Sequence, residues 1–195
     1  MPKGSEIRKA DYPIDKLFLD RWSPRAMSGE SISEEELMTL FEAARWAPST
    51  YNEQEWRFIY AKRGSADWDR LFNLLMEANQ VWCGNAAVLA CAVSKKTFTK
   101  NNKANPVHTF DCGSAWENLA LQASIMGLVA HGMAGFDYEK AKIELNIPDD
   151  YKVEMMFVVG RHGKKEDLPE NLQEMEYPSD RKKVSEFIFE GKFRI

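Results

Sequence analysis

The sequence contains none of the short glycine-rich motifs that commonly bind phosphate groups. Its 195 residues show neither G-x-G-x-x-G nor G-x-x-x-x-G-K-[ST]. The G-x-S-x-G elbow of many hydrolases is also missing, and the three histidines lie far apart, without the H-E-x-x-H spacing of zinc enzymes. Because the chain offers no obvious nucleophile or metal site, a bound cofactor that supplies the reactive atom would fit this gap.

Cysteine, net charge and long apolar runs are scarce as well. Cys83, Cys91 and Cys112 show no C-x-x-C spacing, so we expect reduced structural thiols. A net charge of −4 without a long basic face argues against nucleic acid as a partner. The best apolar run, residues 86–93, is too short to cross a membrane. The N-terminus lacks the apolar core of a secretory signal, so we expect a cytoplasmic protein.

The composition is that of a globular protein. Hydrophobic residues make up 44% and charged residues 29%, and the length suits one domain that spans residues 1–195. Aromatic residues reach 12% and include six tryptophans. This enrichment suits an interface or a site for a flat ligand, and equally a plain hydrophobic core.

Apolar periodicity predicts helices and strands in mixed order. A capping box, Ser33 followed by Glu36, predicts the start of a helix that ends before Pro48. Further helices are expected over residues 67–78, 111–127 and 137–145, and strands over residues 56–61, 86–93 and 155–159. Because these elements show no regular βαβ rhythm, the sequence favours an α+β sandwich.

The two ends of the chain differ from its middle. Residues 1–12 are polar and predict a loose arm, and the first ordered segment begins at Ile14. The tail from Lys164 onward starts charged and ends in apolar residues, namely Val184, Phe187, Ile188, Phe189 and Phe193. We expect so apolar a tail to be buried, either against a second subunit or on its own domain.

Residues 21–25, Arg-Trp-Ser-Pro-Arg, are called the RWSPR segment below and combine two guanidinium groups with a hydroxyl. Arginine makes planar, multidentate contacts to phosphate, and serine adds a donor. In an extended stretch Arg21, Ser23 and Arg25 project to the same side. The segment could therefore line an anionic ligand without a glycine loop, although such a segment alone is more often a solvated surface.

Two later loops carry further candidate ligand groups. Residues 47–56 are rich in amides and hydroxyls, and Asn52 and Gln54 suit the edge of a heteroaromatic ring. Residues 131–137 contain Gly132 and Gly135, which let a backbone approach a flat ligand closely. Taken alone, each loop is more often an ordinary turn.

The order and spacing of these clusters resemble the nitroreductase family of FMN-dependent oxidoreductases, from about Ile14 to the C-terminus. The pieces are the RWSPR segment, A-x-x-A-P-S-x-x-N-x-Q-x-W at residues 44–56, Asn-Gln-x-Trp at 79–82, the long helix at 111–127, Gly-Phe at 135–136 and Arg181. No single piece is specific, whereas their combination in this order is.

The resemblance implies an α/β/α sandwich with a mainly antiparallel central sheet, assembled as an intertwined homodimer with two FMN sites at its interface. It implies FMN as cofactor, NADH or NADPH as co-substrate, and a small-molecule acceptor such as a nitroaromatic or quinone in a ping-pong reaction. The chemistry then occurs at flavin N5, and no protein residue is required as nucleophile or acid.

The resemblance also implies roles for individual residues. It places Arg21, Ser23 and Arg181 at the phosphate and ribityl end of FMN. It places Arg25 at the flavin N1–C2 edge, where a cation stabilises the anionic reduced flavin. Trp22 belongs to the same candidate set, but it stands where many members carry a second basic residue, so one phosphate contact is in doubt.

The remaining cofactor-binding candidates are Pro48, Ser49, Thr50, Asn52, Asn79, Met133, Ala134 and Gly135. Residues 48–50 would flank the ring from the other subunit, and residues 133–135 would lie along it with backbone amides near N5. Asn79 matches a position at the pyrimidine edge, and Asn52 with Gln54 can be structural. The chain departs from the family pattern at Glu55, which replaces the usual proline, and it lacks the long lid insertions of some relatives.

Alternative functions remain open at this stage. One is a related flavin enzyme with another acceptor, such as a reductive dehalogenase. A second is a flavin-binding or regulatory protein with little turnover, which Trp22 and the missing lid would suit. A third is an interaction module without flavin whose apolar tail docks on a partner.

Overall fold

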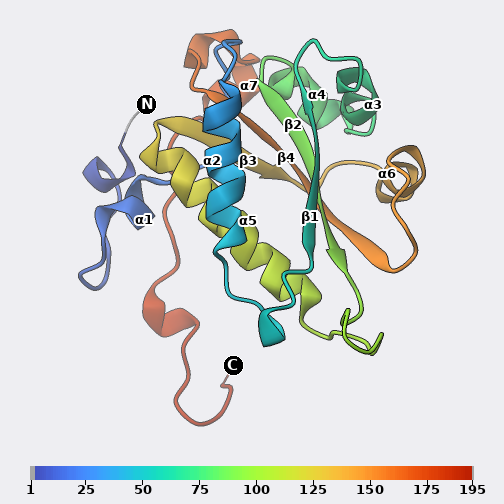
Figure 1. Cartoon of the computed structure of the whole chain (residues 1–195). Coiled ribbons are helices and arrows are strands. Elements are labelled where there is room, and N and C mark those ends of the chain that lie inside the picture. Colours follow the sequence, from blue (N-terminus) through green and yellow to red (C-terminus); the bar gives the residue numbers. More distant parts are fainter. Residues whose placement is uncertain (1–2, 195) are drawn as a thin grey trace.

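The computed structural model describes residues 3–194 and contains one four-stranded antiparallel sheet (Figure 1). Its strands are β1 (Trp56–Lys62), β2 (Val88–Lys95), β3 (Leu128–Met133) and β4 (Tyr151–Arg161). They lie in the order β1-β2-β4-β3, and every neighbouring pair is antiparallel.

Helices cover both faces of the sheet. The helices are α1 (Lys16–Asp20), α2 (Glu34–Arg45), α3 (Trp68–Phe72), α4 (Glu77–Cys83), α5 (His108–Ile125), α6 (Tyr138–Glu144) and α7 (Glu170–Gln173). Short 3-10 turns are η1 (Gly4–Glu6), η2 (Thr50–Asn52), η3 (Lys165–Asp167) and η4 (Val184–Glu186). Helices α2 and α5 pack on one face, and α3, α4 and α6 contribute to the core on the other. The predicted α/β/α sandwich with an antiparallel sheet is therefore confirmed.

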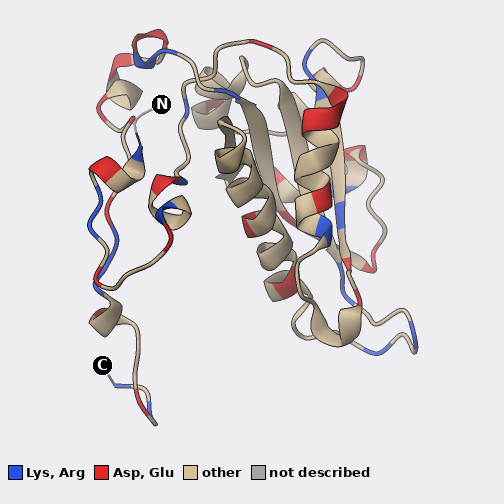
Figure 2. Cartoon of the chain, turned by 60° about the vertical axis from the view of Figure 1, so that its left-hand side comes forward, with Lys and Arg blue, Asp and Glu red and all other residues tan. Residues whose placement is uncertain are grey.

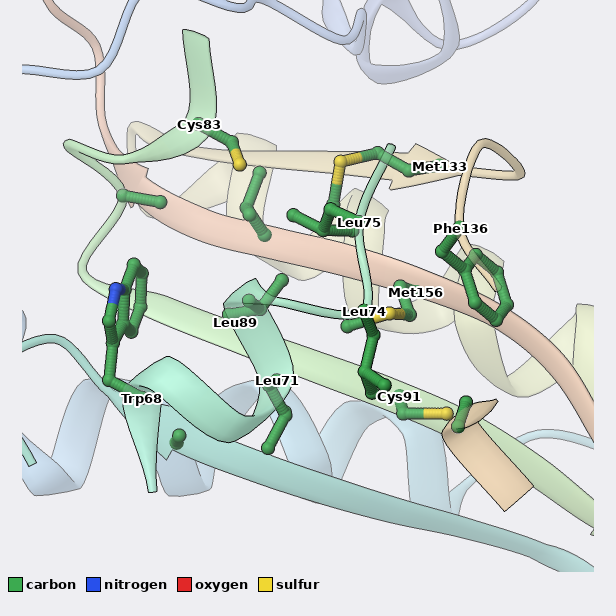
Figure 3. Close-up of a cluster of buried hydrophobic side chains, with 14 of the residues drawn as sticks. Trp68, Leu71, Leu74, Leu75, Cys83, Leu89, Cys91, Met133, Phe136 and Met156 are labelled. Atoms are coloured by element: carbon green, nitrogen blue, oxygen red, sulfur yellow. The ribbon is translucent and has the colours of Figure 1, made fainter. Parts of the chain in front are cut away.

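Strand β2 lies at the centre of both cores. Leu89, Cys91 and Val93 point to the α3, α4 and α6 side, whereas alternate residues of the strand point to α2 and α5. Figure 3 shows Leu89 and Cys91 among the buried side chains of the first cluster. Burial on both faces explains why this strand reads as an uninterrupted apolar run in the sequence.

The local signals for helix ends are confirmed. Ser33 Oγ accepts from the amide of Glu36, and the Glu36 carboxylate accepts from the amide of Ser33. Asp137 caps α6 by accepting from the amide of Lys140. Gly127 follows α5 with a φ of +69°, a conformation that favours glycine.

The helix expected over residues 67–78 is wrong. The structure has two short helices there, α3 and α4, separated by residues 73–76. Leu75 leaves the helical path to form an isolated β-bridge with Phe136, and the amide of Asp137 donates to Leu74 O. Tertiary pairing with the chain after β3 outweighs local helix propensity in this stretch. Strand β3 was also missed, so His131 and Gly132 lie in a strand and not in a loop.

The N-terminal arm, residues 3–12, is held in place, contrary to the expectation of a loose segment. Arg8 donates to the carbonyl oxygens of Leu19, Arg21 and Ser179. Asp11 accepts from the Lys183 ammonium and the Val184 amide. The arm therefore runs beside the C-terminal segment, residues 164–194, on one side of the molecule (Figures 1 and 2).

The apolar tail is not buried on its own chain. Phe187 is 58% exposed and Phe193 78% exposed, and Ile188 and Phe189 are exposed as well. In Figure 1 the tail leaves the sheet and ends well away from it. Of the two expectations for this tail, burial on its own domain is wrong.

The three cysteines are free and buried, as predicted. Burial raises the pKa of each thiol to about 12, so these side chains act as small hydrophobic groups. Among residues 3–194, no helix has the length and hydropathy needed to cross a membrane.

Removing the α2 cap gives a direct test of the local folding signal. We expect Ser33→Ala to lower the free energy of unfolding by about 1 kcal/mol, because the first turn of α2 loses its side-chain acceptor. Urea denaturation measures the change. Ser31→Ala is the control, since Ser31 is exposed and lies just before the capping box. An equal loss in both variants would contradict the specific role of the cap.

Candidate functional site

A cavity of about 390 Å³ opens beside the RWSPR segment. Its walls come from three parts of the chain: the N-terminal arm, the RWSPR segment with β3, and the C-terminal segment. The lining residues are Arg8, Arg21, Trp22, Ser23, Arg25, His131, Met175, Tyr177, Ser179 and Arg181. It is called the arginine cavity below, because four guanidinium groups border it.

The RWSPR segment presents alternate residues to the arginine cavity, as its sequence predicts. Arg21, Ser23 and Arg25 are partly exposed, whereas Trp22 and Pro24 between them are buried. Trp22 also borders the cavity, yet most of its ring packs inside, 6.1 Å from the ring of His162. The Trp22 side chain therefore acts mainly in packing, and its indole Nε1 has no hydrogen-bond partner among the described residues.

Two contacts hold the backbone of the segment. The Glu176 carboxylate, almost completely buried, accepts from the amide of Arg25 through both oxygens at 3.0 Å and from the amide of Ala26 at 3.0 Å. His131 Nδ1 lies 2.9 Å from Pro24 O. Burial lowers the pKa of His131, so the neutral ring donates through Nδ1 to that carbonyl. These bonds fix where the Arg25 side chain leaves the backbone.

The donor set of the arginine cavity fits a phosphate group. Arg21 is paired weakly with Glu117, at 3.4 Å, and its Nη1 lies 3.4 Å from Ser23 Oγ. Arg181 donates to Ser179 and Asp180, and no ion pair of the described residues engages Arg25. Several arginines with so few acidic partners leave excess positive charge, which an anion of two negative charges would neutralise.

Asn79 and Gly135 lie together, and neither of them lines the arginine cavity. Asn79 Nδ2 donates to Gly135 O at 2.9 Å. A Cβ at Gly135 would approach that nitrogen to 2.7 Å, so a larger residue there would displace Asn79. Trp82 joins this pair to the cavity: its Nε1 donates to Asn79 Oδ1 at 3.3 Å, and its ring lies 4.6 Å from that of His131. Met133 is buried at the end of β3, and neither it nor Ala134 borders the cavity.

The loop at residues 48–54 does not border the arginine cavity of the same chain. The Thr50 amide donates to Asp111 Oδ2 at 2.8 Å, and Ser49 Oγ accepts from the Gln54 amide at 3.0 Å. Asn52 has a φ of +58°, and its carbonyl accepts from the Gln54 side chain. The Gln54 amide and side chain, together with the Asn52 carbonyl, thus stabilise the loop.

Glu55, the departure from the family pattern, is a buried carboxyl group. It is 1% exposed, accepts from Asn105 Nδ2 at 2.8 Å, and lies beside Asp111. Burial, and then the negative charge of Asp111, raises the pKa of Glu55 above its usual value. The same Asp111 holds the Thr50 amide, so this acid pair supports the loop from below.

The fold and the site define a class of protein: an antiparallel α/β/α sandwich with an arginine-lined cavity. The nitroreductase family model matches residues 19–82 and 75–161, which is more than half of the chain. The chain therefore belongs to the nitroreductase family.

Three relatives illustrate the likeness. A solved oxidoreductase containing FMN is 44% identical, with a TM-score of 0.92 and coverage of 96% of both chains. A protein from Desulfovibrio desulfuricans, solved in complex with FMN, has a TM-score of 0.71 and covers 95% of this chain and 100% of its own, but at 22% identity it shows the fold alone. An Archaeoglobus fulgidus protein assigned as a NADH dehydrogenase/NAD(P)H nitroreductase is 29% identical over 113 residues, or 58% of this chain and 62% of that relative. The match thus spans less than two thirds of that relative.

Sequence reasoning missed several residues that build the cavity. Arg8 lies in a polar arm that shows no pattern, and Glu176 is one acidic residue in a charged stretch. Tyr177 and Ser179 precede the predicted Arg181 by four and two residues. In an extended segment this spacing places all three side chains on the same side, which was a signal that they share the site. The structure does bring Arg21, Ser23, Arg25 and Arg181 together, as the resemblance predicts.

The Glu176 contact predicts a large effect on stability. We expect Glu176→Ala to lower the free energy of unfolding by about 3 kcal/mol, because two backbone amides lose a charged acceptor. Chemical denaturation measures it. The control is Glu174→Ala, two residues earlier and exposed, for which we expect little change. Similar losses in both variants would contradict the role of the buried carboxylate.

The raised pKa of Glu55 predicts the sign of a pH dependence. Because the folded state holds the Glu55 proton more tightly than the unfolded state, stability falls as pH rises above the usual value of 4.5. Glu55→Gln should remove this loss, so its stability relative to wild type increases with pH. Urea denaturation from about pH 3 to pH 8 measures the difference and also covers the range in which a lowered carboxyl pKa acts.

Glu53→Gln is the matched comparison, because the pKa of Glu53 is shifted in the opposite direction to that of Glu55. Hydrogen bonding from Thr99 lowers the pKa of Glu53, so the contribution of this residue is lost as pH falls. A parallel response of the two variants would refute the assignment of Glu55 as the buried acid.

Proposed function

We propose that this protein is an FMN-dependent oxidoreductase that uses NADH or NADPH to reduce small acceptors such as nitroaromatics or quinones. The observation that carries the proposal is the arginine cavity, in which two separate segments place Arg21, Ser23, Arg25 and Arg181 around one space. Membership of the nitroreductase family and the likeness to a solved oxidoreductase containing FMN support it further.

Arg21, Ser23 and Arg181 would hold the phosphate and ribityl end of FMN. Guanidinium groups and a hydroxyl are suitable donors for phosphate oxygens. Arg8, Trp22 and the backbone contacts to Glu176 and His131 would keep these donors in place. FMN, when bound, supplies the redox chemistry, taking electrons from NAD(P)H and passing them to an acceptor in a ping-pong sequence.

Arg25 would stabilise the negative charge of the reduced cofactor. Its guanidinium carries no ion pair among the described residues, and its backbone is fixed by Glu176. A preorganised cation lowers the cost of charge development because no reorganisation is required during the reaction. Asn79, Met133, Ala134 and Gly135 would contact the flavin ring, as the family resemblance implies.

We further propose a homodimer with FMN at its interface, in which Pro48, Ser49 and Thr50 come from the second subunit. Two observations support a second copy. The loop at residues 48–54 is well formed but lies outside the arginine cavity of its own chain. The tail aromatic residues are exposed in the single chain, and burial against a partner would remove that exposed apolar surface.

The visible spectrum of the purified protein tests the cofactor assignment. We expect flavin absorption bands that NADH or NADPH bleaches under anaerobic conditions. Protein that is colourless and stays colourless with added FMN would contradict the proposal. Bound flavin that nicotinamides reduce only very slowly would instead support a flavin-binding protein with little turnover.

Arg25 gives a sharper test of mechanism. We expect Arg25→Ala to slow flavin reduction about a hundredfold, because a preorganised cation at the developing charge is lost, while FMN retention changes less. Stopped-flow reduction and FMN titration measure the two effects. Arg25→Lys is the matched control because it keeps the charge, and it should retain most of the rate. Weaker FMN binding with an unchanged reduction rate would contradict the assigned role.

A further inference from the structure

The N-terminal arm brings Arg8 into the arginine cavity, although this residue lies outside the segment that matches the nitroreductase family model. That match begins at residue 19. Arg8 is partly buried and borders the cavity together with Arg21 and Arg181. The arm therefore contributes a donor to a site whose other donors belong to the RWSPR segment and the C-terminal segment.

The hydrogen bonds of Arg8 connect both of those segments. Its Nη1 donates to Leu19 O at 2.8 Å and to Arg21 O at 2.9 Å, and its Nε donates to Ser179 O at 2.8 Å. Arg181 Nη1 donates to the same Ser179 carbonyl at 3.2 Å. One guanidinium thus fixes the spacing between Arg21 and Arg181, whose backbones are 160 residues apart in sequence. Its second terminal nitrogen, Nη2, is engaged in none of these bonds.

Arg8 lies close to two other cations of the cavity, Arg21 and Arg181. Burial, and then the positive charges of Arg181 and Arg21, lower the pKa of Arg8, while Asp180 and Asp20 offset this in part. Three cations held this close repel one another, and an anion between them would remove the repulsion. Inside a partly buried cavity the effect is stronger than at an open surface.

We propose that Arg8 determines the selectivity of this cavity for a flavin that carries a terminal phosphate. It does so by adding a cation and by fixing the distance between Arg21 and Arg181. This inference rests on the proposed function, since it names a residue that the FMN site would use. It predicts that Arg8 contributes to binding of the phosphate group and contributes little to binding of the flavin ring.

The test compares FMN with riboflavin, which lacks the phosphate. Apoprotein is titrated with each flavin, and quenching of flavin fluorescence gives the Kd. We expect Arg8→Gln to weaken FMN binding at least tenfold and to leave riboflavin binding within about twofold, because only the phosphate contact is lost. The salt dependence of FMN binding should also decrease, since one cation fewer faces the phosphate.

Two further variants separate charge from geometry. Arg8→Lys keeps the charge but loses the forked donor, so we expect an intermediate loss of FMN affinity. Lys9→Gln is the control on the same arm, since Lys9 is exposed and does not border the arginine cavity. It should bind both flavins like wild type. Equal weakening of FMN and riboflavin in Arg8→Gln, or no weakening of either, would overturn the proposal.

Failure of the proposed function can be told apart from failure of this inference. If wild-type protein binds neither flavin, the proposed function fails, and inorganic phosphate then tests Arg8 alone. We expect phosphate to raise the melting temperature of wild type more than that of Arg8→Gln. Equal shifts would overturn the role of Arg8. If Arg8→Gln does not fold, the same comparisons are made with Arg8→Lys, where loss of selectivity supports the inference and unchanged selectivity overturns it.

Discussion

The buried carboxylate of Glu176 accepts hydrogen bonds from the amides of Arg25 and Ala26, and the arrangement of the site depends on this contact. A carboxylate so deeply buried is tolerated only where donors satisfy it. The chain after β4 must therefore return across the RWSPR segment, a separation of about 150 residues. Once it has returned, Tyr177, Ser179 and Arg181 necessarily line the cavity that Arg25 borders.

This arrangement brings several arginine side chains close together, and their positive charges repel one another. The arm and the C-terminal segment lie side by side (Figure 2), and each carries a cation to the cavity. Arg8 donates to three carbonyl oxygens and so holds the two segments together, but it adds a further positive charge. A cavity in which the guanidinium groups outnumber their acidic partners suits an anionic ligand, and this is the physical basis of the proposed FMN site.

The opposite half of the proposed site has a different construction. Residues 48–54 are held by Asp111 and by bonds among themselves, so the loop keeps its shape without help from the arginine cavity. Glu55 and Asp111 form a buried acid pair beside it. The loop and the exposed aromatic tail are the parts of the chain that the proposed homodimer would use at its interface.

Much of the fold followed from local signals. The capping box at Ser33, the periodicity of α5, the apolar run of β2 and the alternation within the RWSPR segment each depend on neighbours in sequence, so the sequence determined them directly. The family order of three individually weak clusters also predicted that Arg21, Ser23, Arg25 and Arg181 share one site. Local propensity failed at residues 67–78, where the bridge between Leu75 and Phe136 ended the helix.

Only the tertiary structure decided which other residues complete the site. Glu176 and Arg8 have ordinary sequence surroundings, and their importance arises from hydrogen bonds to backbone groups 150 and 171 residues away. Such contacts leave no periodic trace, because any carboxylate or guanidinium at a suitable place could make them. The sequence by itself determined most of the elements, the family and the cations of the RWSPR segment. The folding of both chain ends onto that segment decided how those cations are spaced and what charge surrounds them.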